Sequence, residues 1–307
     1  MAGYADGVPC WADAMLNDLE AGKRFYGELL GWTFGATDPE WSSYTQAYGP
    51  GGKNVAALAP KPDGRMPTVW NLYLASSDIQ GTARGTREAG GQLIMEPMAV
   101  GPFGSMMTAA DPTGAVFGVW QAGTHSGFET TGQPGSFVWA EIFTRDPAKA
   151  DAFYEGVFGY RGKEILEKSA IAANATDAEA ATDAETPQTG DTVPDAADDA
   201  DAANTPDTPD TDFRIFVPAG QEVTVGNAVL GRFRMSGRYP EEMPPHILVY
   251  FAVADADRAA ETVVRLGGRI TRGPVDSPFG RFLLVSDDQG AHFGLIDTTT
   301  TVGEKPS

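Results

Sequence analysis

Apolar and polar positions form a clear pattern in a short amphipathic segment that occurs twice. Residues 18–32 read DLEAGKRFYGELLGW, and residues 146–160, which lie 128 positions later, read DPAKADAFYEGVFGY. The Asp that opens each segment can cap a helix, and the Gly near its end suits the left-handed stop of a helix. Phe25 and Leu29 are four residues apart and therefore share one helix face. The pattern predicts two equivalent helices and a chain built from two copies of one unit.

An alternating strand pattern precedes each of these helices. Trp-Ala-Asp at 11–13 matches Trp-Ala-Glu at 139–141 at the same offset of 128 residues. Since side chains alternate between the two faces of a strand, residues two apart share a face. The side chains expected on one face are Trp11, Asp13 and Met15 in the first copy, and Trp139, Glu141 and Phe143 in the second. Each copy thus places one carboxylate among apolar side chains.

Strand and helix signals repeat again within the first half of the chain. After the first helix, three strands are expected at 32–37, 41–48 and 54–58, separated by Pro and Gly. A strand, a helix and three further strands follow between residues 68 and 121. The first half is therefore expected to be a βαβββ unit followed by another βαβββ unit.

The second half follows the same plan with one insertion. Tyr73 and Asp78 return as Tyr250 and Asp255 at an offset of 177, so 49 residues have been added to the earlier offset of 128. Residues 169–212 contain twelve acidic residues, no Lys or Arg and no aromatic residue. Such a segment cannot bury enough apolar surface to offset the entropy cost of ordering it, so we expect a disordered acidic loop.

These patterns divide the chain into two domains joined by a linker that is rich in Gly, Ser and Thr. The expected boundaries are 1–122 for the first domain, 123–135 for the linker, 136–300 for the second domain, about 167–212 for the acidic insert within it, and 301–307 for a tail.

Charge and composition narrow the possible functions. The 307 residues include 42 acidic and 22 basic residues, which give a net charge of −20. Such a chain repels nucleic-acid phosphates and anionic membrane surfaces, so we expect neither as a partner. The single cysteine, Cys10, excludes an internal disulfide framework, and no apolar run approaches the ~20 residues of a membrane-spanning helix. We therefore expect a cytoplasmic protein, either a monomer or a homodimer.

The repeated FYxxxxG helix ending, the paired βαβββ units and the closing segments DPTGAVFG and DDQGAHFG together resemble the vicinal oxygen chelate superfamily. This family includes glyoxalase I, bleomycin-resistance proteins and extradiol dioxygenases, and the chain is most similar to its two-domain glyoxalase-like proteins of high-GC bacteria. The resemblance covers both halves except the acidic insert and the tails. It implies an α+β fold of tandem domains, in which two βαβββ modules form a cupped mixed sheet with the helices outside.

Enzymes of this family hold a divalent metal through side chains on the first, fourth, fifth and eighth strands of a domain. The resemblance places these positions at Asp13, Ala56 or Ala57, Asn71 and Gly118 in the first domain, and at Glu141, 227–230, Leu248 and Gly294 in the second. A divalent cation in a protein needs about three His or carboxylate ligands. We therefore expect no cofactor; a divalent metal held in part by Glu141 and His292 is the weaker alternative.

The inner faces of the two cups favour a binding role. The predicted ligand-binding residues are Trp11, Asp13, Met15, Asn71, Tyr73, Trp120, Trp139, Glu141, Phe143, Tyr250 and His292. An aromatic inner wall suits an aromatic or otherwise hydrophobic small molecule, which the protein would sequester or carry. The alternative is a lyase, isomerase or dioxygenase in which Asp13 or Glu141 transfers protons or helps to hold a metal. A third hypothesis gives the acidic insert a protein-interaction role, and simple core packing of these side chains also stays open.

Overall fold

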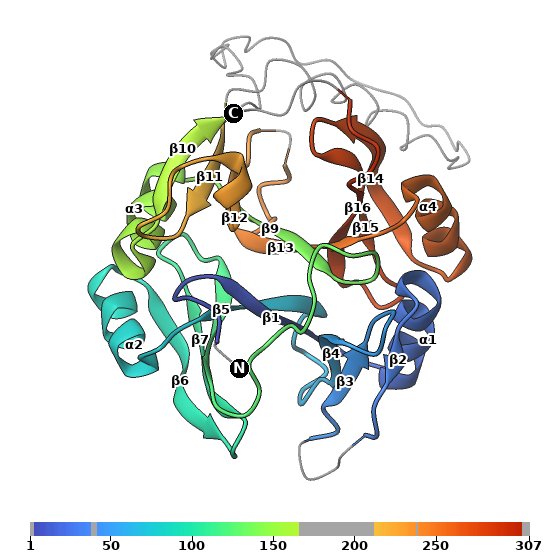
Figure 1. The fold of residues 1–307 in the computed structure, drawn as a ribbon, viewed down its shortest axis with the longest axis horizontal. Coiled ribbons are helices and arrows are strands. Elements are labelled where there is room, and N and C mark those ends of the chain that lie inside the picture. Colours follow the sequence, from blue (N-terminus) through green and yellow to red (C-terminus); the bar gives the residue numbers. More distant parts are fainter. Residues whose placement is uncertain (1–2, 38–41, 166–211, 238, 303–307) are drawn as a thin grey trace, which may run out of the picture.

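The structure, a computed structural model, describes residues 3–37, 42–165, 212–237 and 239–302. Within these ranges two eight-stranded sheets lie at the centre and four α-helices lie outside them (Figure 1). The acidic insert predicted at about 167–212 lies almost entirely outside the described residues. Its predicted role in protein interactions therefore stays a hypothesis.

The two sheets have the same strand order. The first sheet contains β1 (Pro9–Leu16), β2 (Thr33–Phe34), β3 (Thr45–Tyr48), β4 (Asn54–Pro60), β5 (Val69–Ala75), β6 (Gln92–Val100), β7 (Gly104–Ala110) and β8 (Val116–Ala122). The second contains β9 (Phe137–Thr144), β10 (Arg161–Ile165), β11 (Phe213–Val217), β12 (Leu230–Arg234), β13 (His246–Ala252), β14 (Arg269–Ser277), β15 (Gly280–Ser286) and β16 (His292–Asp297). The orders are β2-β3-β4-β1-β5-β8-β7-β6 and β10-β11-β12-β9-β13-β16-β15-β14. Each strand of the second sheet thus takes the place of the strand eight positions earlier, which confirms the predicted α+β fold and its internal repeat.

The helices begin and end where their sequence predicts. They are α1 (Leu19–Leu30), α2 (Ile79–Glu88), α3 (Pro147–Phe158) and α4 (Ala256–Arg265), and a short 3-10 helix, η4 (Val225–Asn227), precedes β12. Asp18 and Asp146 each accept a hydrogen bond from the backbone amide three residues later. Gly31 and Gly159 end the repeated helices with φ of 71° and 66°, in the left-handed region that favours glycine. In the described ranges, the helices are too short or too polar to cross a membrane.

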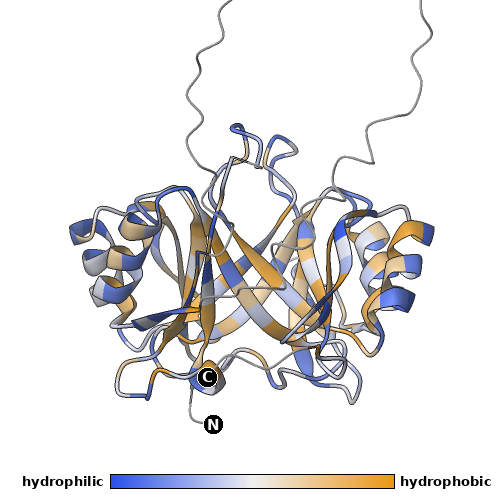
Figure 2. Ribbon diagram, turned by 90° about the horizontal axis from the view of Figure 1, so that it is seen from above, coloured by the Kyte–Doolittle hydropathy of each residue, from blue (hydrophilic) through white to orange (hydrophobic). Residues whose placement is uncertain are grey.

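One face of each sheet packs against the other sheet in a shared core. Figure 2 shows the helices at the two sides of the molecule and hydrophobic stretches on the strands between them. The rings of Trp70 on β5 and Phe251 on β13 lie 4.8 Å apart, and Tyr26 of α1 donates a 2.8 Å hydrogen bond to Asp287. Ala12 of β1 is fully buried in this core. Because strand side chains alternate, the predicted site residues of β1 and β9 lie on the opposite, inner face of each sheet.

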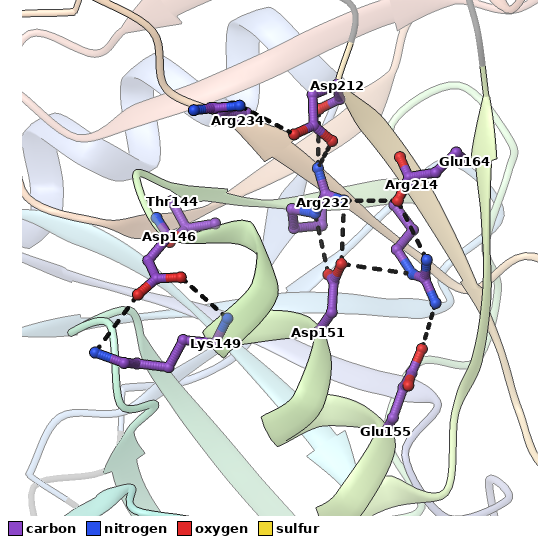
Figure 3. A network of polar contacts seen from close by, with 10 residues as sticks. All are labelled: Thr144, Asp146, Lys149, Asp151, Glu155, Glu164, Asp212, Arg214, Arg232 and Arg234. Atoms are coloured by element: carbon purple, nitrogen blue, oxygen red, sulfur yellow. Dashed lines mark hydrogen bonds and ion pairs between the residues drawn. The ribbon is translucent and has the colours of Figure 1, made fainter.

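A buried arginine holds together the strands that flank the acidic insert. Arg232 on β12 is only 1% exposed, and its guanidinium donates hydrogen bonds to Asp151 of α3, Glu164 of β10 and Asp212 (Figure 3). Arg214 on β11 adds ion pairs with Asp151 and Glu164. Burial of a charged group is tolerated when its donors are paired. The network therefore fixes β10, β11, β12 and α3 relative to one another.

Candidate functional site

The second sheet has a cavity of about 280 Å³ on its inner face. Four of the predicted binding residues line it, namely Trp139, Glu141, Phe143 and Tyr250. Its wall is mainly aromatic and aliphatic, and it includes a few polar side chains, among them Glu141, Tyr250 and Arg272. A small, largely apolar cavity with a few convergent polar groups is the usual form of a small-molecule site.

Glu141 is the centre of a hydrogen-bonded group in this wall. Tyr250 Oη donates to Glu141 Oε2 at 2.8 Å, and Trp139 Nε1 donates to Glu141 Oε1 at 3.1 Å. Burial, and then the negative charge of Glu141, raise the pKa of Tyr250 well above its ordinary value. Tyr250 therefore stays protonated at neutral pH and acts as a donor. The wall presents a phenol and a carboxylate that are held in fixed orientation.

A glycine on the neighbouring strand makes room for the tyrosine. Gly294 on β16 pairs with Tyr250 on β13, and a Cβ at Gly294 would lie 2.1 Å from the Tyr250 ring. The first sheet repeats this arrangement, because a Cβ at Gly118 would lie 2.3 Å from the Tyr73 ring. In both sheets the tyrosine ring thus occupies the space that an eighth-strand side chain would take.

The four metal-binding positions implied by the family resemblance do not fit a divalent cation in the second sheet. Gly231 and Leu248 flank Glu141 on the neighbouring strands, and Gly294 lies one strand further. Gly231 lies just beyond the predicted range 227–230; the range was wrong because η4 occupies its start and β12 begins only at its end. Glu141 is the one carboxylate among these positions, whereas a divalent cation needs about three good ligands.

The first sheet has the same shortage of ligands. Ala57 and Asn71 flank Asp13, and Gly118 takes the eighth-strand position. Across the described ranges, no cluster of three or more His, Cys, Asp or Glu side chains could hold a metal ion.

The carboxylate of the first cup is enclosed. Asp13 is 2% exposed; Asn71 Nδ2 donates to its Oδ1 at 2.9 Å and Tyr44 Oη donates to its Oδ2 at 3.0 Å. Trp11 Nε1 in turn donates to Tyr44 Oη at 2.7 Å. Burial raises the pKa of Asp13 above its ordinary value, and the hydrogen bonds from Asn71, Tyr44 and Tyr73 oppose this shift. Asp13 is therefore a hydrogen-bonded core group with little access to a ligand.

The predicted linker covers the inner face of the first sheet. The His125 ring lies 4.5 Å from the Trp11 ring and 5.8 Å from the Trp120 ring, measured between centroids. Trp120 Nε1 donates to the His125 carbonyl at 2.9 Å, and the amide of Phe128 donates to the Cys10 carbonyl at 2.8 Å. Burial lowers the pKa of His125, so its ring is neutral at pH 7. Trp11 and Trp120, two of the aromatic residues expected to bind a ligand here, therefore contact the linker.

The remaining predicted residues lie in different surroundings. Met15 and Asn71 are half-buried on the inner face of the first sheet, and Tyr73 is buried beside them. His292 is exposed at the start of β16, where it pairs with Ser286, and it is not part of the cavity wall.

Several cavity residues were not identified from the sequence. Phe213, Ile215, Phe233, Phe282 and Leu284 line the cavity together with Arg272. Alternation along β11, β12 and β15 would have placed the apolar members on one face, once each strand was aligned to Glu141 or Gly294. Arg272 is harder to place, because the pairing of β14 with β15 shifts register on both sides of it.

Comparison with known sequences gives consistent matches over most of the chain. The sequence pattern of the Glyoxalase/Bleomycin resistance protein/Dioxygenase superfamily matches residues 11–119 and 136–295. CFP32 of Mycobacterium tuberculosis, provisionally named a glyoxylase, is 31% identical over 301 residues, with 95% of each chain covered. DauV of Streptomyces sp. strain C5, named an anthracycline biosynthesis protein, is 32% identical over 312 residues, covering 97% of this chain and 95% of its own.

Solved structures share the fold at much lower identity. The Mn(II)-bound glyoxalase from Novosphingobium aromaticivorans aligns with a TM-score of 0.56 at 13% identity, covering 97% of this chain and 86% of that one. An extradiol ring-cleaving dioxygenase from B. fuscum aligns with a TM-score of 0.59 at 13% identity, covering 99% and 74%.

Proposed function

The chain belongs to the glyoxalase/bleomycin resistance protein/dioxygenase superfamily, and we propose that it is a small-molecule-binding member whose second sheet holds an aromatic or otherwise hydrophobic compound. Binding of this kind would serve to sequester or carry the compound. The observation that carries the proposal is the aromatic cavity of about 280 Å³ on the second sheet. The matching face of the first sheet is covered by the linker.

The cavity can bind a flat compound without a metal. Trp139, Phe143 and Phe282 supply ring faces for stacking, and the phenol of Tyr250 supplies a polar group that can orient the compound. Neither carboxylate position has the further ligands that a divalent cation needs, so we propose that binding is independent of metal. The volume of about 280 Å³ lies just below the usual range for small-molecule sites, about 300–1,000 Å³. This size suits a compound of a few fused rings.

The names of two relatives agree with a role in small-molecule chemistry. DauV is named for anthracycline biosynthesis, and anthracyclines are polycyclic aromatic compounds. CFP32 carries a provisional glyoxylase name. The name of DauV supports an aromatic compound as the class of ligand.

Two tryptophan substitutions test which sheet binds. Leu284 on β15 pairs with Gly294, and Thr108 on β7 pairs with Gly118, so the two residues occupy matched positions in the two sheets. We expect Leu284→Trp to fill the cavity and abolish binding of the neutral aromatic probe 2-naphthamide in isothermal titration calorimetry. Thr108→Trp is the matched control and should leave the affinity unchanged. Loss of binding in Thr108→Trp alone would assign the site to the first sheet. If the wild-type protein binds neither 2-naphthamide nor the corresponding acid, 2-naphthoate, the proposal is refuted.

A second candidate function is proton transfer by Glu141. The observation that favours it is the orientation of the carboxylate by Tyr250 and Trp139 within the cavity wall. Asp13 is a weaker candidate, because it is enclosed. If mass spectrometry identifies a compound that co-purifies with the protein, a lyase or isomerase of this kind would convert it. Glu141→Gln would then keep binding but slow the conversion by about a hundredfold or more, whereas a pure binding protein would return the compound unchanged.

A further inference from the structure

A row of matched residues crosses the inner face of each sheet. In the second sheet, Arg272 on β14 pairs with Leu284 on β15, which pairs with Gly294 on β16, which pairs with Tyr250 on β13. Arg272 also lies close enough to Tyr250 for its charge to lower the pKa of that phenol, against the stronger effects of burial and Glu141. The wall of the cavity therefore presents a carboxylate, a phenol and a guanidinium in that order.

The corresponding row of the first sheet has no cation. Met95 on β6 pairs with Thr108 on β7, which pairs with Gly118 on β8, which pairs with Tyr73 on β5. The glycine and the tyrosine are the same in both rows. The positive charge of Arg272 is thus a feature of the second cup that the shared fold does not require.

Arg272 is oriented by an aromatic ring of the cavity wall. Its Cζ lies 5.7 Å from the centroid of the Phe282 ring, within the distance of a cation–π contact, and both residues line the cavity. This contact limits the conformations of a long side chain in advance of binding, which lowers the entropy cost of recognising a ligand. A guanidinium has five N–H donors, so Arg272 can bind a ligand alongside partners within the protein.

From these contacts we infer that the cavity of the second sheet selects an aromatic carboxylic acid in its anionic form. The carboxylate lies against Arg272, and the ring system fills the space between the aromatic walls. This inference rests on the proposed binding function and adds the chemical class of the ligand. Glu141 already has partners within the protein, because one of its oxygens accepts a hydrogen bond from Tyr250 and the other accepts one from Trp139.

Arginine suits this task for geometric reasons. Its planar fork matches the two oxygens of a carboxylate, and a charge-assisted pair of this kind is stronger than a neutral hydrogen bond. The wall around it is apolar, so water competes poorly for the guanidinium once a ring fills the cavity. A neutral ligand of the same shape would gain the stacking contacts but not the ion pair.

A pair of probes of the same shape separates the charge from the stacking. The probes are 2-naphthoate and its neutral amide, 2-naphthamide, titrated at neutral pH, where the carboxylate is ionised. We expect wild-type protein to bind 2-naphthoate about tenfold to about a hundredfold more tightly than 2-naphthamide. Arg272→Met, which introduces the residue of the matched first-sheet position, should remove this preference, so that the two probes bind with similar affinity.

Two further variants complete the test. Arg269→Met removes an exposed arginine from the same strand, outside the cavity wall, and should keep the preference. Arg272→Lys keeps the charge but not the planar fork and should restore part of the preference. Retained binding of 2-naphthamide by Arg272→Met also shows that the variant is folded.

The outcomes distinguish this inference from the proposed function. Binding of 2-naphthamide with no preference for 2-naphthoate would overturn the inference and leave the binding function standing. A preference that persists in Arg272→Met would likewise overturn it. If neither probe binds to the wild-type protein, both the inference and the binding function fail.

Discussion

The inner faces of the two sheets share the same arrangement of key residues but differ in what covers those residues. Each has a carboxylate on the first strand, a tyrosine on the fifth and a glycine on the eighth. In the first sheet, however, Tyr44 donates to Asp13. In the second sheet the matched residue is Phe213, which has no hydroxyl group to donate. The match follows from the pairing: Tyr44 lies two residues before the partner of Ala57, and Phe213 lies two residues before the partner of Gly231. A single hydroxyl group thus helps to make one carboxylate a core group, while the other borders a cavity.

The linker adds to this difference between the cups. The ring of His125 contacts both Trp11 and Trp120 on the first sheet. The second sheet keeps its aromatic residues around a cavity instead. Duplicated sheets can therefore be specialised by changing only what lies against the inner face.

The helix-facing side of the sheets shows a second contrast. Leu58 on β4 pairs with Ala14 on β1, and Arg232 on β12 pairs with Ile142 on β9, so Leu58 and Arg232 occupy matched positions. Leu58 is fully buried among apolar residues, whereas Arg232 is 1% exposed within the ion-pair network of Figure 3. The same place in the fold accepts either a hydrocarbon or a charge, provided that the charge has partners.

The largest effect on stability is expected when Arg232 is replaced by the residue that the first sheet has at the matched position. Arg232→Leu introduces the first-sheet residue but leaves Asp151 and Asp212 without their main partner. We expect a loss of about 3–5 kcal/mol in the free energy of unfolding, measured by urea denaturation. Arg234→Leu is the control, because its side chain is 49% exposed and should cost less than about 1 kcal/mol. Equal stability of Arg232→Leu and wild type would mean that the network adds nothing to the fold.

A smaller effect should distinguish the two carboxylates. Asp13→Ala leaves the donors of Asn71 and Tyr44 unpaired in an enclosed site and should cost about 3 kcal/mol of unfolding free energy without changing the affinity for 2-naphthamide. Glu141→Ala should cost only about 1 kcal/mol of unfolding free energy, because its partners border the cavity and are less enclosed. It should also weaken binding, because the Tyr250 phenol loses the partner that holds its orientation. Denaturation and calorimetry on both variants measure these effects. The comparison fails if both variants lose stability and affinity to the same extent.

The smallest effect concerns pH. The pKa of Asp13 is raised by burial in the folded state, so folding favours the protonated acid. The stability that this proton contributes is fully present below the ordinary pKa of 3.8 and is lost as the pH rises through the folded pKa. Asp13→Asn, which cannot ionise, should therefore gain stability relative to wild type as the pH rises from about 4 to about 8. A difference in unfolding free energy that stays constant with pH would show that Asp13 does not titrate in this way.

Much of the fold follows from local sequence. The Asp and Gly residues that end each repeated helix determine where the helices begin and stop, because capping depends on side chains within a few residues. Alternation in WAD and WAE determines that Asp13 and Glu141 share a face with their neighbouring tryptophans. The poor set of metal ligands also follows from the sequence, because it depends only on which residue types occupy four strand positions.

The identity of the open cup was decided by tertiary structure alone. Local pattern determines which face of a strand a side chain takes, but the atoms that lie against that face come from distant parts of the chain. Tyr44, which directly precedes β3, donates to Asp13, and His125 of the linker contacts Trp11. Alternation does not predict the face on which Arg272 lies, because the pairing of β14 with β15 shifts register on both sides of it. Binding residues predicted by alternation were therefore equally plausible in both cups, and only the packed structure encloses one set and leaves the other facing a cavity.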